Sequence, residues 1–544
     1  MKIKLILALL VSTFMFQGCD DDLEIAQNDN ITSENLYNTS SGALAGLAGI
    51  YSRIGQVYKS AAINGQYPTN STDEGHYNRK GTSSFLKNNF TPSDPQLTKV
   101  WALYYEAISG TNAYLTNLKN ASLEESDKKE FLAEVHFLRA FVYFDLQKAF
   151  GGLEGIPMPL EDTAKQLLPR TPGLEVYKQI ISDLEFAEEF LPSDAETTPG
   201  RAGKGVARGL LAKVYLYIAG EPFNEPGSYE KSRAWSKKVM DDQYHELNPS
   251  YQDVFDQLAM ENYDKKEVLF QIGYSFATLD SNQSSKLGSV FGQLVHDEAC
   301  GKGYSVTYAT ISLVLKYRSD PSDERGLWNA SPYYIPRNND CNYKTINNQF
   351  TYAASKYRRN LEANYSNTSF GSHHWPVLRY SDVLLMFAEA ENKLAPGSQQ
   401  ALDALNTVRN RAKATPVTVI TDEVIQEERM LELCFEGQRK YDLIRWGLLT
   451  SRVAETKSVM EFYAGNANFT NEDWTIYGEP NLGPDGVPQS GDEPTDLNIR
   501  TNNLHGSFNY YDGYNDYDSS KHKWLPIPEQ EIGVNSNLKQ SAGW

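Results

Sequence analysis

Three glutamates have a spacing that suggests shared chemistry. Glu428, Glu432 and Glu436 are four residues apart, so they would lie on one face of a helix. Aligned carboxylates can bind a metal ion or act as the acid and base of a glycosidase. No histidine lies at ligand spacing, but three arginines lie close in the sequence: Arg429, Arg439 and Arg445. We therefore expect a structural ion network rather than a catalytic site.

Two other groups could bind metal ions. His373 and His374 are adjacent, so in a regular element their side chains would point in different directions, and no third ligand is patterned around them. Asp512, Asp516 and Asp518 offer oxygen ligands for calcium, but they lack the glycine and terminal glutamate of an EF-hand. A solvated acidic loop is the favoured interpretation, with calcium binding as the alternative. We predict no metal and no other cofactor.

Motifs of common enzyme classes are absent from the sequence. There is no nucleophile elbow, phosphate-binding loop or dinucleotide fingerprint in a fitting strand-to-helix context. This absence favours a binding protein over an enzyme.

Residues 62–95 are rich in Asn, Thr, Ser, Gly and Pro, which predicts a long exposed loop. A tyrosine in such a loop can stack on the apolar face of a sugar ring, while Asp, Asn and Arg can hydrogen-bond to hydroxyl groups. Packing within the loop is the alternative role for each aromatic side chain. The candidate ligand-binding residues here are Tyr67, Asp73, His76, Tyr77 and Arg79.

The chain has 544 residues and a formal net charge of −19. This length is enough for one large or two medium domains. The acidic balance argues against a nucleic acid partner. Among the four cysteines, Cys300 and Cys341 lie in loop-like sequence and could pair, whereas Cys434 lies in an apolar stretch and is expected to be a buried free thiol.

Helical spacing of apolar residues predicts a mostly α fold. Two regions interrupt it, at residues 275–375 and 463–523, and we expect these loop-rich insertions to carry function. The helices occur in pairs that suggest tetratricopeptide-like hairpins, although the repeat is irregular. The expected helices span residues 43–50, 101–115, 124–150, 174–191, 203–219, 229–240, 309–317, 377–394, 399–412, 422–435 and 437–449.

The N-terminus resembles that of a bacterial lipoprotein. Two lysines precede an apolar run at residues 5–16 that is too short to span a bilayer, and Gly18 directly precedes Cys19. We predict a signal peptide at residues 1–18 and acyl chains on Cys19 that anchor the protein to the outer membrane. The acidic residues 20–22 resemble the surface-export signal of Bacteroidetes lipoproteins. An ordinary secretory signal is the alternative.

Several blocks along the whole chain resemble the SusD/RagB family of Bacteroidetes outer-membrane lipoproteins. The most specific block runs from Glu436 through Arg439-Lys440-Tyr441-Asp442 to Trp446-Gly447. The other blocks follow in family order: Phe137 to Leu146, Phe150-Gly151-Gly152, Gly200-Arg201, Arg379 to Ala390, Leu405 to Ala412, Leu525 to Pro528, and Gly543-Trp544.

The resemblance implies a SusD-like fold with four tetratricopeptide-like helix hairpins and a loop-rich ligand-binding region. It divides the chain into residues 19–220 and 221–544, which we expect to form one compact unit. It also implies a partner, a SusC-type TonB-dependent outer-membrane transporter. By position in the family, the second ligand-binding segment runs from Phe291 to Tyr304, and Trp328, Tyr333 and Tyr334 extend that region.

The expected function is capture of an oligosaccharide or polysaccharide at the cell surface, without catalysis, for import through that transporter. A peptide-capturing member of the same family is one alternative. A secreted hydrolase on a helical scaffold is another.

Overall fold

The computed structural model describes residues 36–79, 84–161, 167–275, 284–337, 341–346, 349–362, 369–465 and 512–544. The predicted signal peptide, Cys19 and the acidic residues 20–22 lie outside these ranges, as does most of the predicted insertion at 463–523. None of the helices in the described ranges combines the length and apolar character needed to cross a bilayer.

Helices dominate the described part of the chain. Their bounds are α3 Ser40–Tyr58, α4 Tyr67–Thr69, α5 Pro95–Lys119, α6 Glu125–Leu146, α7 Gly173–Phe190, α8 Lys204–Ala219, α9 Ser228–Asp241, α10 Tyr251–Ala259, α11 Leu287–Phe291, α12 Ile311–Arg318, α13 Arg325–Asn329, α14 Tyr380–Leu394, α15 Gln399–Arg411, α16 Asp422–Leu433, α17 Arg439–Arg445, α18 Leu449–Gly465, α19 Asp512–Asn515 and α20 Glu529–Val534.

The strands are short. They are β1 Gly75–Tyr77, β2 Val268–Ile272, β3 Thr307–Ala309, β4 Ala330–Ser331, β5 Tyr333–Tyr334, β6 Lys344–Thr345, β7 Ala353–Ala354 and β8 Trp375–Arg379. Strands β1, β3, β7 and β4 form one small sheet in that order, β2 pairs with β8, and β5 pairs with β6.

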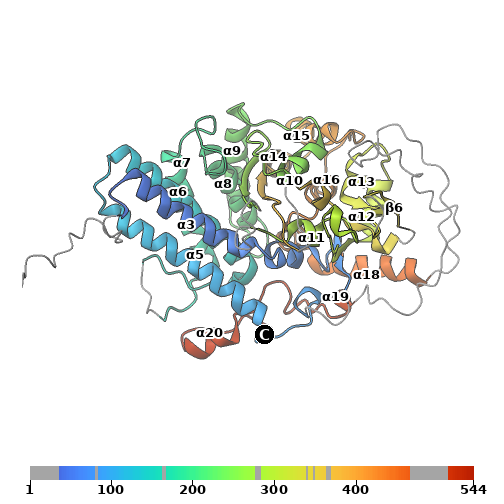
Figure 1. Cartoon of the computed structure of the whole chain (residues 1–544), viewed down its shortest axis with the longest axis horizontal. Coiled ribbons are helices and arrows are strands. Elements are labelled where there is room, and N and C mark those ends of the chain that lie inside the picture. Colours follow the sequence, from blue (N-terminus) through green and yellow to red (C-terminus); the bar gives the residue numbers. More distant parts are fainter. Residues whose placement is uncertain are drawn as a thin grey trace, which may run out of the picture.

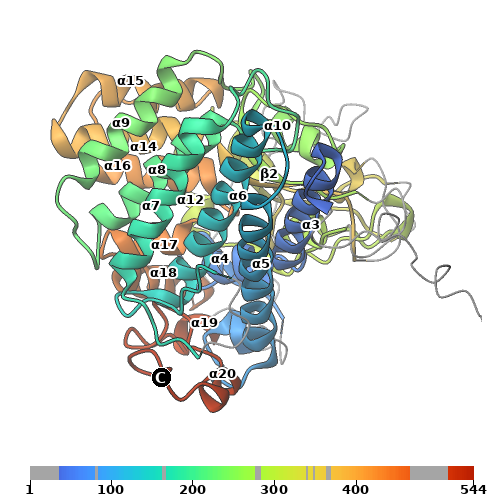
Figure 2. The same ribbon diagram turned by 90° about the vertical axis from the view of Figure 1, so that its left-hand side faces the viewer.

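The long helices pack side by side in a curved array. Contacts run from α3 to α5, α6, α7, α8, α9, α14 and α15, each helix packing on the next, and Figure 2 shows this succession. The loop-rich part, with α11, α12, α13 and β6, lies at the other end of the molecule from α6 and α7 (Figure 1). One apolar core extends from Ala43 to Leu538 and crosses residue 220. The division of the chain at that residue stays a prediction.

Local sequence explains where the helices begin. Asp94 caps α5, because its side chain accepts a hydrogen bond from the backbone N–H of Gln96, and Pro95 occupies the first helical position. Thr421 caps α16 in the same way, with Val424 as donor. From Phe131 onward α6 is almost wholly buried, which explains why its sequence is apolar on most sides.

Three expectations about local structure were wrong. The helix expected at 437–449 is shorter: α17 ends at Arg445, because Gly447 adopts a left-handed conformation (φ 72°), and a separate helix, α18, begins at Leu449. Residues 375–379 form β8 rather than the start of α14. Residues 61–76 are buried rather than exposed, because Ile63 and Tyr67 bring this segment into the core.

Candidate functional site

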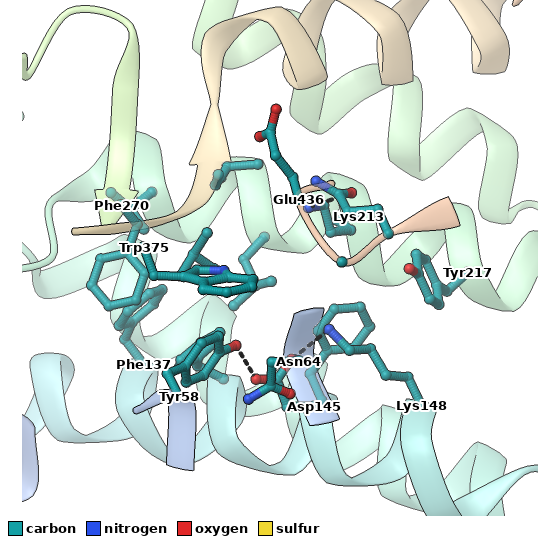
Figure 3. A pocket seen from close by; sticks show the side chains of 18 residues that line it. Tyr58, Asn64, Phe137, Asp145, Lys148, Lys213, Tyr217, Phe270, Trp375 and Glu436 are labelled. Atoms are coloured by element: carbon teal, nitrogen blue, oxygen red, sulfur yellow. Dashed lines mark hydrogen bonds and ion pairs between the residues drawn. The ribbon is translucent and has the colours of Figure 1, made fainter. Parts of the chain in front are cut away.

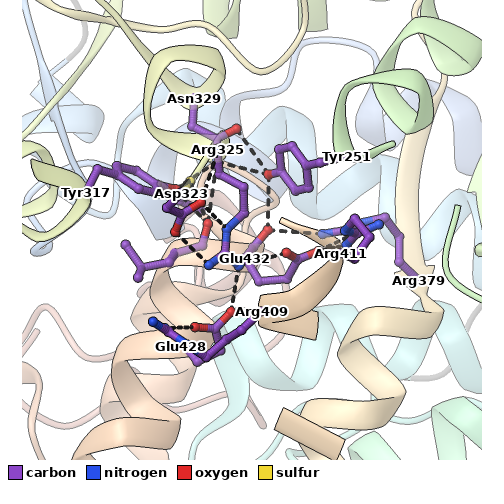
Figure 4. A network of polar contacts seen from close by, with 12 residues as sticks. Tyr251, Tyr317, Asp323, Arg325, Asn329, Arg379, Arg409, Arg411, Glu428 and Glu432 are labelled. Carbon is purple, nitrogen blue, oxygen red and sulfur yellow. Dashed lines mark hydrogen bonds and ion pairs between the residues drawn. The ribbon is translucent and has the colours of Figure 1, made fainter. Parts of the chain in front are cut away.

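The aligned glutamates form a structural ion network, as expected (Figure 4). Glu432 lies at its centre, where its carboxylate accepts hydrogen bonds from Arg411 (2.6 Å), Arg379 (2.8 Å) and Arg325 (3.0 Å). Glu428 binds Arg325 at 2.6 Å. These side chains are buried, so each charge is neutralised by its neighbours rather than by solvent.

The charges in this network are held in their ionised forms. Burial alone would raise the pKa of Glu432, but Arg411, Arg379 and Arg325 outweigh it and hold that pKa well below its ordinary value. Burial would likewise lower the pKa of Arg379, but Glu436 and Glu432 raise it well above its ordinary value. A carboxylate fixed in one protonation state is unsuited to acid–base catalysis.

The partners differ from those nearest in sequence. Arg325, Arg379 and Arg411 come from three other elements, whereas Arg429 binds Asp382 (2.9 Å) and Asp442 (2.9 Å) in a neighbouring cluster. The network joins α13, β8, α15 and α16, and so connects the loop-rich region to the helical array.

The two histidines have separate structural roles. Nδ1 of His373 lies 2.7 Å from the Glu362 carboxylate, and Nδ1 of His374 lies 2.7 Å from the Gln271 amide. Burial lowers the pKa of His374 to about 4, so its ring is neutral. Within the described ranges, no group of three or more His, Cys, Asp or Glu side chains is placed to hold a metal ion.

The C-terminal aspartates do not converge. Asp512 pairs with Lys87 at 2.9 Å, and Asp518 accepts hydrogen bonds from the backbone and side chain of Ser520. Asp516 is exposed.

Five of the eight expected ligand-binding residues lie in the interior, so they do not form an exposed face. Tyr67, Asp73, His76, Phe291 and Trp328 are each at most 6 % exposed. Segment 61–76 and helices α11 and α13 carry these residues inward because they are part of the core, not loops over it.

Each of these five has a partner that explains its burial. The contacts are Tyr67 stacked on Phe85, Asp73 in a two-bond pair with Arg439 (2.6 and 2.7 Å), His76 edge-on to Tyr308, Phe291 against Phe435, and Trp328 under the guanidinium of Arg358.

The other three residues, Tyr77, Arg79 and Tyr304, come together. Strand β1 pairs antiparallel with β3, which places Tyr77 opposite Thr307. The ladder continues through Asn78, whose backbone N–H donates to the Val306 carbonyl and whose side-chain amide donates to the Ser305 carbonyl (2.6 Å). Arg79 then reaches Tyr304, with its guanidinium carbon 5.4 Å from the ring centre. Backbone pairing thus joins segments more than 220 residues apart.

A second backbone ladder extends this surface. Val295 bridges Gly303 on one side and Ile335 on the other. Val295 and Ile335 are buried against Cys300. Their neighbours in the sequence therefore face outward, because side chains alternate along extended chain. His296 and Lys302 flank Tyr304 there, and the ring of His296 meets that of Tyr334 at 6.1 Å.

We call the resulting surface the platform, defined by Tyr77, Arg79, His296, Lys302, Tyr304 and Tyr334. Tyr304 and Tyr334 lie about two strand spacings apart, or roughly 10 Å. All six side chains are half-buried or exposed. The platform therefore offers ring faces flanked by hydrogen-bond donors.

The backbone turns sharply beside Tyr304. Ser305 is a non-glycine residue with φ 42°, in the left-handed region. The backbone N–H groups of Tyr304 and Ser305 both donate to the Ser289 carbonyl, at 2.8 and 3.1 Å. Such conformations cost energy and are found preferentially at functional sites. Here the turn lets Tyr304 stay at the surface while β3 enters the core.

A disulfide supports the platform from below. Cys300 and Cys341 are bonded, so the pairing that the sequence left open is present. The bond ties the 295–303 hairpin to the segment that leads into β6. Cys434 is a buried free thiol, as expected.

Sequence reasoning placed Tyr334 in the second ligand-binding region but missed His296, Lys302 and Tyr308. Tyr308 packs on His76, and burial raises its pKa, although its hydrogen bond with Asn78 and the nearby charge of Arg79 oppose this. The only sequence signal for the others was their position within the loop-rich insertion, and that signal did not single out residues.

The chain also has a small cavity, lined by aromatic and charged side chains, between α6, α8 and the α16–α17 turn (Figure 3). Its volume is about 30 Å³, which is room for water but not for a sugar. Lys148 lies 2.5 Å from Asp145, and Lys213 lies 2.8 Å from Asp382. We therefore regard this cavity as part of the packed interior and not as a ligand-binding site.

Two family models match the chain. One, described as "SusD family", matches residues 326–544, and another, described as "Starch-binding associating with outer membrane", matches residues 27–216. The chain belongs to the SusD/RagB family. The descriptions place the family at the outer membrane and among carbohydrate-binding proteins.

Relatives of this SusD family member match most of its length. SusD-like protein P2 from Formosa agariphila is 28 % identical over 431 residues, which cover 71 % of this chain and 82 % of the relative. The solved structure of a SusD homologue from Bacteroides thetaiotaomicron aligns with a TM-score of 0.78 at 22 % identity, covering 94 % of this chain and 98 % of the other.

A laminarin-binding SusD-like protein aligns with a TM-score of 0.65 at 20 % identity, covering 92 % of this chain and 99 % of the other. At these identities the structural matches establish the fold. They confirm the expected mostly helical, SusD-like architecture. The number of tetratricopeptide-like hairpins stays a prediction.

Proposed function

We propose that this SusD family member captures oligosaccharides on the platform, without catalysis, and passes them to a SusC-type TonB-dependent transporter. One observation carries the proposal. Two backbone ladders bring Tyr77, Arg79 and Tyr304 to one surface from segments far apart in the sequence. Family membership supplies the carbohydrate class.

The platform suits a sugar chain physically. The rings of Tyr304 and Tyr334 can stack on the apolar faces of pyranose rings, and the donors of Arg79, His296 and Lys302 can bind hydroxyl groups at their edges. Two tyrosines whose backbones lie roughly 10 Å apart favour a chain of several sugars over a single one. A shallow surface desolvates little area, so we expect affinities on the order of micromolar to millimolar.

Calorimetric titration against a glycan panel tests this proposal. We expect Tyr304→Ala to weaken binding of the cognate glycan by about 1–3 kcal/mol and Tyr77→Ala to weaken it within the same range. Thermal unfolding should change little for Tyr304→Ala, because this ring is only half-buried and lies at the edge of the core, near the charges of Arg79 and Lys302.

Phe462→Ala is the matched control, because Phe462 is an aromatic residue of α18 that is 58 % exposed and lies outside the platform. It should bind like the parent. If Tyr304→Ala and Tyr77→Ala both bind glycan as the parent does, the platform is not the site. Binding of peptides instead of glycans, or loss of substrate during incubation, would favour the alternative functions.

The membrane anchor is a separate part of the proposal. Cys19→Ala should release the protein from membranes, because the acyl chains would be lost. Replacing residues 20–22 with alanine should leave the protein membrane-bound but protected from protease added to intact cells. Co-purification of the transporter with the wild-type lipoprotein tests the partnership. A Cys19→Ala protein that still fractionates with membranes would contradict the anchor.

A further inference from the structure

The platform is basic, although the chain as a whole is acidic. The formal net charge of the chain is −19, yet four cationic side chains lie on or beside the platform. Arg79 and Lys302 approach the Tyr304 ring, at 5.4 and 5.9 Å from its centre. Lys344 is paired with Tyr334 across the β5–β6 ladder. Arg337 is close enough to Lys302 to repel its charge.

Acidic side chains compensate only part of this charge. Glu298 pairs with Lys302 at 2.9 Å, and Asp297 accepts a hydrogen bond from the backbone N–H of Ala299. Arg79, Arg337 and Lys344 have no ion pair with any residue in the described ranges. Among the described residues, four cations against two acids leave two positive charges in excess at this surface.

Arg79 is the cation best placed to meet a ligand. It is exposed, and its guanidinium lies over the ring of Tyr304, where a stacked sugar would be adjacent. A guanidinium presents a planar fork of N–H donors that matches a carboxylate or a sulfate. Hydroxyl groups alone require no such charge, and a neutral sugar would leave the excess positive charge without a partner.

We propose that the platform selects anionic oligosaccharides, which carry uronate carboxylates or sulfate esters, and that Arg79 pairs with the anionic group. This inference rests on the proposed glycan-binding function and specifies its substrate class. The positive charge at the platform also attracts such a ligand locally against the negative field of the rest of the molecule. Because the surface is open to solvent, this attraction is screened by salt.

Matched pairs of ligands test the inference without altering the protein. The probes are polygalacturonate and alginate, each beside its carboxyl-reduced form, and chondroitin sulfate and ulvan, each beside its desulfated form. Laminarin, xyloglucan and starch serve as neutral glycans. Affinity is measured by calorimetry or by retardation in glycan-loaded native gels, at 50 mM and 500 mM NaCl.

We expect at least one anionic glycan to bind, and its carboxyl-reduced or desulfated form to bind on the order of tenfold more weakly. The higher salt concentration should weaken binding of the anionic ligand and leave binding of neutral ligands nearly unchanged. The carboxyl-reduced and desulfated forms distinguish the two sources of negative charge.

Protein variants give an independent test. Arg79→Ala should weaken binding of the anionic ligand on the order of tenfold. Arg79→Lys should restore only part of that loss, because lysine keeps the charge but not the planar fork. Lys231→Ala, a charge-matched control at an exposed position on α9, should bind as the parent does. Tyr304→Ala should weaken the binding of anionic and neutral ligands alike.

The outcomes separate the two proposals. If neutral glycans bind as tightly as anionic ones, or Arg79→Ala binds an anionic glycan like the parent, the anionic preference is refuted and glycan capture stands. If no glycan of either kind binds, the proposed function fails and this inference fails with it.

Discussion

Replacing Glu432 with glutamine should destabilise the protein strongly without touching the platform. The carboxylate of Glu432 is fully buried and receives Arg325, Arg379 and Arg411. Glutamine has nearly the same shape as glutamate, so the substitution removes the charge but preserves the packing. One buried guanidinium charge is then no longer balanced.

The expected loss of stability depends on the other carboxylate partners that the three arginines keep. Three charge-assisted hydrogen bonds of about 1.5–3 kcal/mol each would sum to at least about 4.5 kcal/mol if they were independent. They are not, since Arg325 keeps Asp323 and Arg379 keeps Glu436. Glutamine also retains one acceptor oxygen. We therefore expect a loss of about 3–5 kcal/mol, the range for removing one partner of a buried ion pair.

Urea unfolding monitored by tryptophan fluorescence measures this loss. The control is Glu427→Gln on the same helix, because Glu427 forms a largely exposed pair with Lys316 whose side chains are 37 % and 49 % exposed. That variant should change stability by no more than about 1 kcal/mol. If Glu432→Gln and Glu427→Gln shift the urea midpoint equally, the network contributes nothing beyond a surface pair, and the reasoning is refuted.

Two further predictions concern stability. Burial lowers the folded-state pKa of His374 from 6.5 to about 4, so the unfolded chain takes up protons that the folded chain does not, and stability should fall as pH drops from about 6.5 toward 4. Urea midpoints at pH 7 and pH 5 should differ less in His374→Gln than in the parent, and an unchanged difference would contradict the assignment. The Cys300–Cys341 bond spans a sequence separation of 41 residues, so Cys341→Ser should cost about 4 kcal/mol by the loop-entropy relation, and reducing the parent with dithiothreitol should bring the two urea midpoints together.

The sequence predicted the helices well because their evidence is local. Apolar spacing and the breaks after each helix located the ends of α6 to α9 and α14 to α16 within a few residues, whereas α5 extends beyond its expected range at both ends. The errors occurred where contacts between residues far apart in the sequence determine the local structure. Segment 61–76 has loop-like composition, but some of its polar side chains find partners inside the core, as when Tyr104 donates to Asn64 at 2.8 Å. That partner, 40 residues away, leaves no trace in local composition.

The site was predicted as a region rather than as residues. Composition cannot tell a tyrosine that stacks in the core from one that stacks on a ligand, so Tyr67 and Tyr77 looked alike. Burial separates them, because Tyr67 stacks on Phe85 in the core, whereas Tyr77 is half-buried at the end of β1. Likewise, Asp73 looked like a ligand-binding carboxylate because its partner Arg439 lies 366 residues away. The ion network was predictable in kind but not in partners, for the same reason.

The platform rests on main-chain hydrogen bonds, and this has an evolutionary consequence. The two ladders that hold it use backbone groups of residues 294–296, 303 and 335 and of residues 75–78 and 306–309. Side chains at 79, 296, 302, 304 and 334 can therefore be exchanged without breaking the frame beneath them. Recognition and folding draw on different atoms, so mutation can explore new ligands at little risk to the native state. A library randomised at these five positions should yield mostly folded proteins with diverse glycan preferences.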